Sequence, residues 1–157
     1  MNSFIKMLMF IMLTTFLYMP TAMAGLYDDV DENIKEDMLV NPDRYMKSTS
    51  LGTGAVLGID KESIDVEMYN PPHYIINFKA FTIAYRSNGE WITQYPRVYK
   101  IYYNWNDRKA YIYGKDHDTG IEGWQELSRK SKYYWRFIQV ADDVFKIAYN
   151  IKFFTTN

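Results

Sequence analysis

The stretch from His73 to Gly114 constrains the fold most, because strand-like runs alternate in it with two turn signals. Asn88-Gly89 separates the first two runs. Both residues accept a positive φ, which makes the pair the strongest short-range signal for a two-residue hairpin turn. The second signal, Asn104-Trp105-Asn106-Asp107, is rich in turn formers. This pattern predicts three consecutive antiparallel strands.

The two turns also predict a pairing register. A turn centred on Asn88-Gly89 places Ile76 opposite Ile101. A turn centred on residues 104–107 places Ile101 opposite Ala110 and Tyr103 opposite Arg108. Because side chains alternate along a strand, both registers sort the residues onto the same two faces. The predicted core face carries Tyr74, Ile76, Phe78, Tyr99, Ile101, Tyr103, Ala110 and Ile112. The second, amphipathic face carries Ile75, Asn77, Lys79, Val98, Lys100, Tyr102, Lys109, Tyr111 and Tyr113.

This separation of faces degrades toward the Asn88-Gly89 tip. Pro96, which cannot donate to a ladder, falls opposite Phe81, and apolar residues follow on the otherwise polar face. The pattern predicts a β-bulge or bend there, or else a tip that is covered on both sides.

Residues 1–24 have the pattern of a cleaved signal peptide. Lys6 precedes an apolar run from Met7 to Tyr18, and Ala22-Met23-Ala24 has the small-x-small form of a cleavage site. The apolar run is too short for a comfortable membrane span, and an uncleaved anchor is the alternative. We therefore expect an exported protein that is secreted, periplasmic or on the cell surface. Its mature part, residues 25–157, is the size of a single domain.

The composition of residues 25–157 restricts the function further. Without Lys6 they hold 17 basic and 19 acidic residues, and this near balance gives no general argument for nucleic acid. Cysteine is absent, so neither a disulfide framework nor a lipoprotein anchor is available. The 24 aromatic residues of this part provide the large buried areas that such a domain needs.

The remaining segments complete a two-layer α+β domain. Residues 27–43 predict a short helix capped by Asp28 or Asp29. Residues 44–68 predict two short strands separated by a turn at residues 60–63, and residues 124–127 predict a final strand. Residues 134–151 predict a helix with an apolar stripe that reaches Ile151, whereas Asp142 faces away. We expect an antiparallel sheet of about five to six strands with this C-terminal helix packed on its core face.

This order of elements suggests a family. A Val-Leu-Gly-Ile-Asp-Lys-Glu-Ser-Ile segment at residues 56–64 precedes a long strand, two hairpins and a C-terminal helix in an exported chain. In this the chain resembles the surface-adhesin protein E-like group of small bacterial exported proteins. The resemblance covers residues 55–64 and the element order through about 151. It implies an antiparallel sheet with a packed helix and a binding role at the cell surface, and it carries over no functional residue.

Catalytic motifs have weaker support in this sequence than a binding role. Asp118-Thr119-Gly120 matches the core of an aspartic protease site but has no second copy, so we interpret it as a polar surface turn. Gly52, Gly54 and Gly58 have neither dinucleotide nor P-loop spacing and indicate a turn. The chain has two histidines and no nucleophile elbow, and His73 is expected at the start of a strand.

Two acidic clusters could in principle hold a metal ion. Asp116-His117-Asp118 offers three ligands, and Asp29-x-Asp31-x-Asn33 begins like a calcium loop but has Ile34 where glycine is required. We interpret both as solvated turns and predict no metal or other cofactor.

The amphipathic sheet face is the remaining candidate site. Tyrosines beside lysines can stack on sugars or bases, hydrogen-bond at a rim and form protein interfaces. The alternatives are a solvated face whose lysine stems cover the tyrosine rings, or a face under the N-terminal segment. The predicted ligand-binding residues are Lys79, Lys100, Tyr102, Lys109, Tyr111 and Tyr113.

These patterns predict an exported, non-enzymatic, adhesin-like binding module. Its expected partner is an envelope or extracellular protein or glycan, without nucleic acid and without a membrane span in the mature form. The alternatives are a small exported hydrolase and a structural envelope protein.

Overall fold

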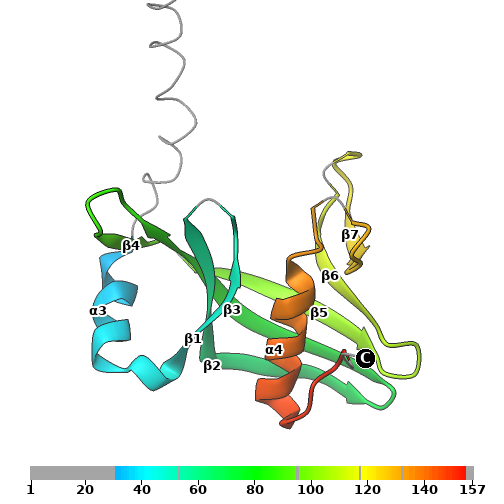
Figure 1. Cartoon of the computed structure of the whole chain (residues 1–157). Helices are drawn as coiled ribbons and strands as arrows, with labels where there is room; N and C mark the ends of the chain where they lie inside the picture. Colours follow the sequence, from blue (N-terminus) through cyan, green and yellow to red (C-terminus); the bar gives the residue numbers. More distant parts are fainter. Residues whose placement is uncertain (1–30, 53, 95, 117, 132, 155–157) are drawn as a thin grey trace, which may run out of the picture. The chain divides into compact units, whose positions relative to one another are not determined.

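The computed structural model describes residues 31–52, 54–94, 96–116, 118–131 and 133–154. Within them, one antiparallel sheet of seven strands carries a C-terminal helix, so the predicted α+β class is confirmed (Figure 1). Six strands follow the order β1-β2-β3-β5-β6-β7, and the short β4 pairs with β3. The elements are α3 (Glu32–Val40), the 3₁₀ turn η1 (Pro42–Arg44), β1 (Tyr45–Ser50), β2 (Ala55–Asn70), β3 (His73–Tyr85), β4 (Trp91–Thr93), β5 (Arg97–Asn104), β6 (Lys109–Lys115), β7 (Glu122–Glu126) and α4 (Phe137–Tyr149).

The predicted register of the first hairpin is confirmed where β3 pairs with β5, and that of the second is wrong by two residues. At the tip of the first hairpin Tyr85 pairs with Trp91, and the Arg86 amide donates to the Glu90 carbonyl, so the turn has three residues (87–89) instead of the predicted two. Ile76 pairs with Ile101 as expected. Ile101, however, pairs with Ile112 instead of Ala110, and Tyr103 pairs with Ala110 instead of Arg108. A shift by two residues preserves the alternation of side chains, so the two predicted faces survive the error.

The error comes from the turn between β5 and β6, whose closing pair is Asn104 with Lys109. Its four loop residues therefore begin at Trp105 and end at Arg108, one position later than predicted. Trp105 stacks on Phe145 at 5.4 Å, and Arg108 adopts a φ of 52° with its guanidinium 3.6 Å from the Trp105 ring. The Trp105–Phe145 stack and the hydrogen bond from Arg108 to the Phe153 carbonyl hold this loop against the core.

At the Asn88-Gly89 tip, both predicted features are present. Ala80 pairs with Arg97 but Ile83 pairs with Thr93, so the register changes by one residue between β4 and β5. This is the predicted bulge. The tip is also covered on both sides, because the adjacent residues Ile83 and Ala84, which point to opposite faces, are both buried.

The second strand corrects another prediction, because residues 60–63 form a bulge within one long strand instead of a turn between two. The register shifts between Asp60 and Asp65. The Asp60 carboxylate accepts from the Glu62 amide, and the Ser63 hydroxyl accepts from the Lys79 amide at 2.7 Å. These side chains bond to backbone groups that have no ladder partner at the bulge, so the strand continues past it.

The C-terminal helix α4 packs on the predicted core face, which we call the helix face. Phe145 is buried against Tyr103 and Phe153, and the Tyr103 hydroxyl donates to the Ala141 carbonyl at 2.9 Å. Two details of the predicted helix are wrong. Asp142 is buried and accepts from the Phe154 amide at 2.9 Å, whereas Ile151 is 49% exposed. After residue 150 the chain turns back along the helix. The returning segment covers Asp142 and leaves Ile151 exposed.

The first described helix, α3, begins two or three residues later than predicted. Its N-cap is Asp31, whose side chain accepts from the Asn33 and Ile34 amides, instead of Asp28 or Asp29. Those two residues, like the predicted signal peptide at 1–24, lie outside the described part. Arg44 connects this helix to the sheet, because its guanidinium contacts Asp37 at 3.0 Å and Asp60 at 2.7 Å.

Candidate functional site

The sheet face opposite α4, which we call the open face, carries all six predicted ligand-binding residues. Pairing places Tyr102 opposite Tyr111 and Ile75 opposite Tyr102. Tyr113 pairs with Trp124 on the neighbouring strand, so β7 extends the same face. Alternation along β3, β5 and β6 then puts the remaining predicted residues on this side, namely Lys79, Lys100 and Lys109.

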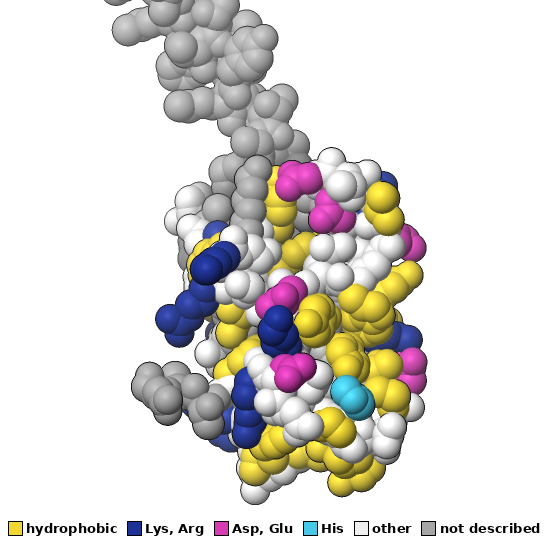
Figure 2. Space-filling view, turned by 90° about the vertical axis from the view of Figure 1, so that its right-hand side faces the viewer, with side chains coloured by type: hydrophobic (Ala, Val, Ile, Leu, Met, Phe, Trp, Pro, Cys, Tyr) yellow, Lys and Arg dark blue, Asp and Glu magenta, His cyan; other side chains and the backbone are white. Residues whose placement is uncertain are grey.

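A groove of about 410 Å³ lies on the open face, and Tyr102 and Tyr111 are among the residues that line it. In Figure 2, hydrophobic side chains gather beside the cyan side chain of His73, the single histidine that the structure describes. The described lining residues are Met68, Ile75, Tyr102, Asn104, Tyr111 and Trp124. The groove therefore combines aromatic rings and aliphatic groups with one amide.

Three lining residues are aromatic, and Tyr113 beside them extends these rings to a cluster of four from three strands. The Tyr102 ring lies 5.8 Å from that of Tyr111 and 5.9 Å from that of Trp124. Tyr113 meets Trp124 edge-on at 5.4 Å. Trp124 and Tyr113 remain 42% and 46% exposed, so a ligand can reach ring surface that the fold does not use.

Tyr102 is held in place by His73, which lies at the start of β3 as predicted. The two rings are nearly parallel, at 15°, and the Tyr102 hydroxyl lies 2.7 Å from His73 Nδ1. Burial raises the pKa of Tyr102 above its ordinary value of 10, so the phenol is protonated at neutral pH. The stacked and hydrogen-bonded contact fixes the orientation of the central ring of the groove.

The lysines form a charged rim instead of part of the aromatic surface. Lys100 Nζ lies 2.6 Å from Glu67, and Lys109 Nζ lies 3.7 Å from Glu126. The hydrogen bonds from Lys100 and then Asn77 lower the pKa of Glu67. Among the described residues, Lys79 has no such carboxylate partner and does not line the groove.

Sequence reasoning missed four lining residues as site members: Met68, Ile75, Asn104 and Trp124. Ile75 was placed on the correct face but was not among the predicted ligand-binding residues. Trp124 belongs to a predicted strand, but the sequence pattern of residues 124–127 does not indicate which strand pairs with it. Extending the alternation across the loop at residues 116–121 would have placed it beside Tyr113, since Lys115 pairs with Glu122. Met68 reaches the groove because β2 has a second register shift between Val66 and Met68, which leaves no signal in the sequence.

The predicted polar turn at Asp118-Thr119-Gly120 has the expected structure. The Asp116 carboxylate accepts from the Asp118 amide at 3.0 Å and from the Thr119 amide at 2.7 Å. His117 lies outside the described residues. No group of three or more potential metal ligands occurs in the part of the chain that the structure describes. Asp31, from the other acidic cluster, caps α3.

Comparison of the chain with protein-family models, with curated proteins and with solved structures found no match.

Proposed function

We propose that this chain is an exported, non-enzymatic, adhesin-like binding module that holds its ligand in the groove of the open face. The observation that carries the proposal is the exposed aromatic cluster of Tyr102, Tyr111, Tyr113 and Trp124 around a groove of about 410 Å³. Contiguous exposed aromatic surface on a small domain typically marks a binding site.

The composition of the groove favours a glycan as ligand. A sugar ring has an apolar face, which can stack on tyrosine or tryptophan, and a hydroxyl edge, which needs donors and acceptors. Asn104 lines the groove, and the Lys109–Glu126 pair lies on the neighbouring positions of the same face. Few polar groups around an aromatic surface are the usual composition of a small-molecule site.

The same contacts favour binding over turnover. His73 is stacked on Tyr102 and hydrogen-bonded to it, and Glu67 and Glu126 are in ion pairs with lysines. Nucleophilic catalysis needs a nucleophile, a base within reach and a group that orients the base. These three side chains are engaged with other partners.

Export and a place at the cell surface rest on the signal-peptide pattern at residues 1–24 and on the resemblance to the surface-adhesin protein E-like group. None of the helices among the described residues has the length and apolar character that crossing a bilayer requires.

A glycan-binding screen tests the proposal. The purified protein is applied to an array of envelope and extracellular-matrix glycans beside the triple variant Tyr102→Ser, Tyr111→Ser, Tyr113→Ser and the single variant Trp124→Ala. The control is Tyr85→Ser, because Tyr85 has a similar exposure of 43% but lies outside the groove. Loss of one stacked ring weakens binding by about tenfold, and the triple variant abolishes detectable binding.

Other outcomes would favour the alternatives. Binding that the triple variant retains in full would remove the open face as the site. Release of shortened glycans would indicate a hydrolase. A particle mass that rises with concentration, without glycan binding, would indicate a structural protein whose open face is covered by a second copy.

A further inference from the structure

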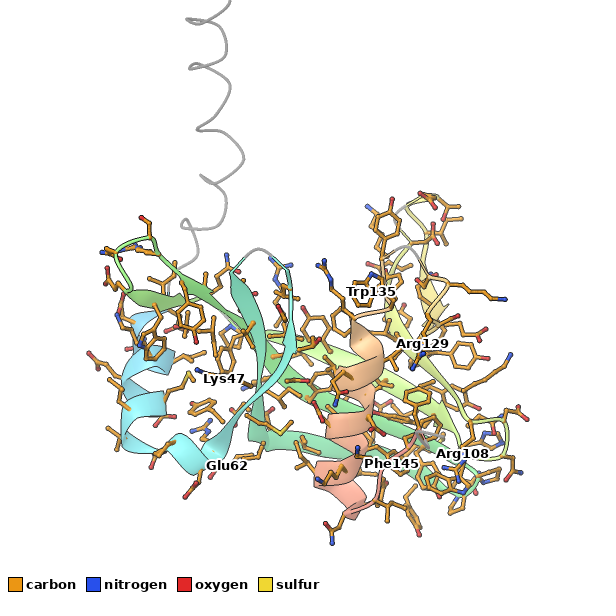
Figure 3. The ribbon with its side chains drawn as sticks, viewed as in Figure 1. Lys47, Glu62, Arg108, Arg129, Trp135 and Phe145 are labelled. Atoms are coloured by element: carbon orange, nitrogen blue, oxygen red, sulfur yellow. The ribbon has the colours of Figure 1, made fainter. Side chains whose placement is uncertain are left out.

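A second cavity, of about 400 Å³, lies beside the start of α4, away from the open face. Figure 3 shows Arg129 and Trp135 next to the first turn of that helix. We call this cavity the arginine pocket. Its described lining residues are Thr49, Arg129, Trp135, Arg136, Ile138 and Gln139.

The two arginines of the pocket have no acidic partner among the described residues. Arg44 and Arg86, in contrast, form ion pairs with carboxylates, and Arg108 donates to the Phe153 carbonyl. The Nε of Arg136 is buried and has no hydrogen-bond acceptor in the described structure. A buried charged donor without an acceptor is rare in folded proteins, so the Arg136 guanidinium keeps hydrogen-bonding capacity that the described residues do not use.

Acidic side chains near the pocket are engaged elsewhere. The Asp143 carboxylate accepts from the Ser48 hydroxyl at 2.5 Å and from the Gln139 amide at 2.9 Å. Asp142 accepts from the Phe154 amide. Neither carboxylate forms an ion pair with an arginine of the pocket.

The backbone at the start of α4 contributes little to anion binding. The Phe137 and Ile138 amides donate to the Tyr134 and Trp135 carbonyls, so they are satisfied within the preceding turn. The charged donors of the pocket are therefore the guanidinium groups of Arg129 and Arg136. The Arg136 guanidinium also lies 5.1 Å from the Trp135 ring, which fixes a planar cation beside a planar aromatic surface.

We propose that the arginine pocket binds an organic oxyanion, a phosphate or carboxylate attached to a small planar or apolar group. Arg129 and Arg136 hold the charged group, since a guanidinium matches the geometry of both anions with paired N–H donors. The attached group packs on Trp135, which is 49% exposed, and on Ile138. This site is independent of the glycan groove, because the two cavities share no lining residue.

Calorimetric titration of the full chain tests the proposal. The probes are inorganic phosphate, phenyl phosphate, benzoate and the neutral benzyl alcohol. Phenyl phosphate or benzoate binds with a Kd of about 1 mM or tighter, inorganic phosphate binds more weakly, and the neutral probe does not bind. The stronger of the two aromatic anions identifies the charged group that the pocket prefers.

Three variants locate the binding. Arg136→Gln and Arg129→Gln each weaken it by about tenfold or more, whereas Arg97→Gln, an exposed arginine on β5, leaves it within about twofold. Arg129 is exposed, so its variant keeps the test valid if Arg136→Gln does not fold. Absence of saturable binding by the aromatic anions would overturn the proposal. So would an equal loss in Arg97→Gln, which would indicate a general effect of charge.

Discussion

Tyr102 and Tyr103 are neighbours on β5, yet they face opposite sides of the sheet and serve different purposes. Tyr103 is fully buried and its hydroxyl donates to the Ala141 carbonyl of α4. Tyr102 lines the groove and its hydroxyl contacts His73. Burial raises the pKa of both phenols, and raises that of Tyr103 by far more. The same side chain fastens a helix on one face and presents a binding surface on the other.

The aromatic residues of the two faces differ in the same way. On the helix face, Phe145 contacts five other rings and is 1% exposed. On the open face, the rings of Tyr102 and Tyr113 each contact Trp124, and Tyr113 and Trp124 keep surface open to solvent. Aromatic clustering therefore does not by itself distinguish a core from a site. What separates them is whether a second layer covers the rings.

The sharpest test of this difference removes one aromatic ring from each face. Phe145→Ala is expected to lower the free energy of unfolding by about 3–5 kcal/mol, because it leaves a cavity among packed rings. Trp124→Ala is expected to lower it by about 1 kcal/mol, because part of the ring is already solvated. Urea unfolding followed by far-UV circular dichroism measures both values. Equal losses would mean that the open face is a core in its own right.

A second pair of substitutions compares the packing around two glycines, Gly58 on β2 and Gly123 on β7. A Cβ added at Gly58 would lie 2.6 Å from the Phe81 ring, whereas one added at Gly123 would meet nothing within 4 Å. Gly58→Ala is therefore expected to cost about 1–3 kcal/mol, and Gly123→Ala to change stability by less than about 1 kcal/mol. Thermal and urea unfolding of the two variants give the comparison, and a tolerated Gly58→Ala would contradict the close packing at the covered tip.

The two neighbouring tyrosines allow a smaller and cleaner test, since each loses one hydroxyl. Tyr103→Phe should lower stability by about 1 kcal/mol, because its hydrogen bond to α4 is buried. Tyr102→Phe should lower it by less than about 0.5 kcal/mol, because water replaces the contact with His73. Chemical denaturation with both variants measured in parallel resolves the difference. The reverse order would place the more important contact on the open face.

The smallest expected effect concerns pH and the rim of the open face. The pKa of Glu67 is lowered from its ordinary value of 4.5 by Lys100 and Asn77, so the folded state favours the charged form. Its contribution to stability is complete above pH 4.5 and is lost as the pH falls through the lower folded pKa. Glu67→Gln should therefore reduce the loss of stability between neutral and acidic pH.

The control for this effect is Glu122→Gln, an exposed glutamate on β7. Urea midpoints at several pH values compare the two variants with the unaltered protein. A pH profile that Glu67→Gln leaves unchanged would show that the Glu67–Lys100 contact contributes nothing to folding.

Much of the sheet followed from short-range signals. The Asn88-Gly89 signal located the hairpin that β3 forms with β4 and β5, and alternation along its strands assigned each residue to a face. The register predicted from the second turn was wrong by two residues. Contacts of Trp105 and Arg108, and not turn propensity, determine where that loop lies. Because side chains alternate with a period of two, a shift of two residues left the predicted site residues on one face.

The site itself was predictable in part. Tyr102, Tyr111 and Tyr113 share one side of neighbouring strands, and their face follows from local alternation. Met68 could not be predicted, because it depends on two bulges that shift β2 against β3. The arginine pocket gave no signal either, since Thr49 and Arg136 are far apart in the sequence and meet where β1 approaches α4.

The sequence by itself determined the α+β class and the two faces of the central strands, because turn chemistry and side-chain alternation act over a few residues. Tertiary structure decided which aromatic rings remain exposed and why Asp142 is buried while Ile151 is not. These outcomes depend on contacts between segments that are distant along the chain. Packing of that kind leaves no periodic trace in the sequence.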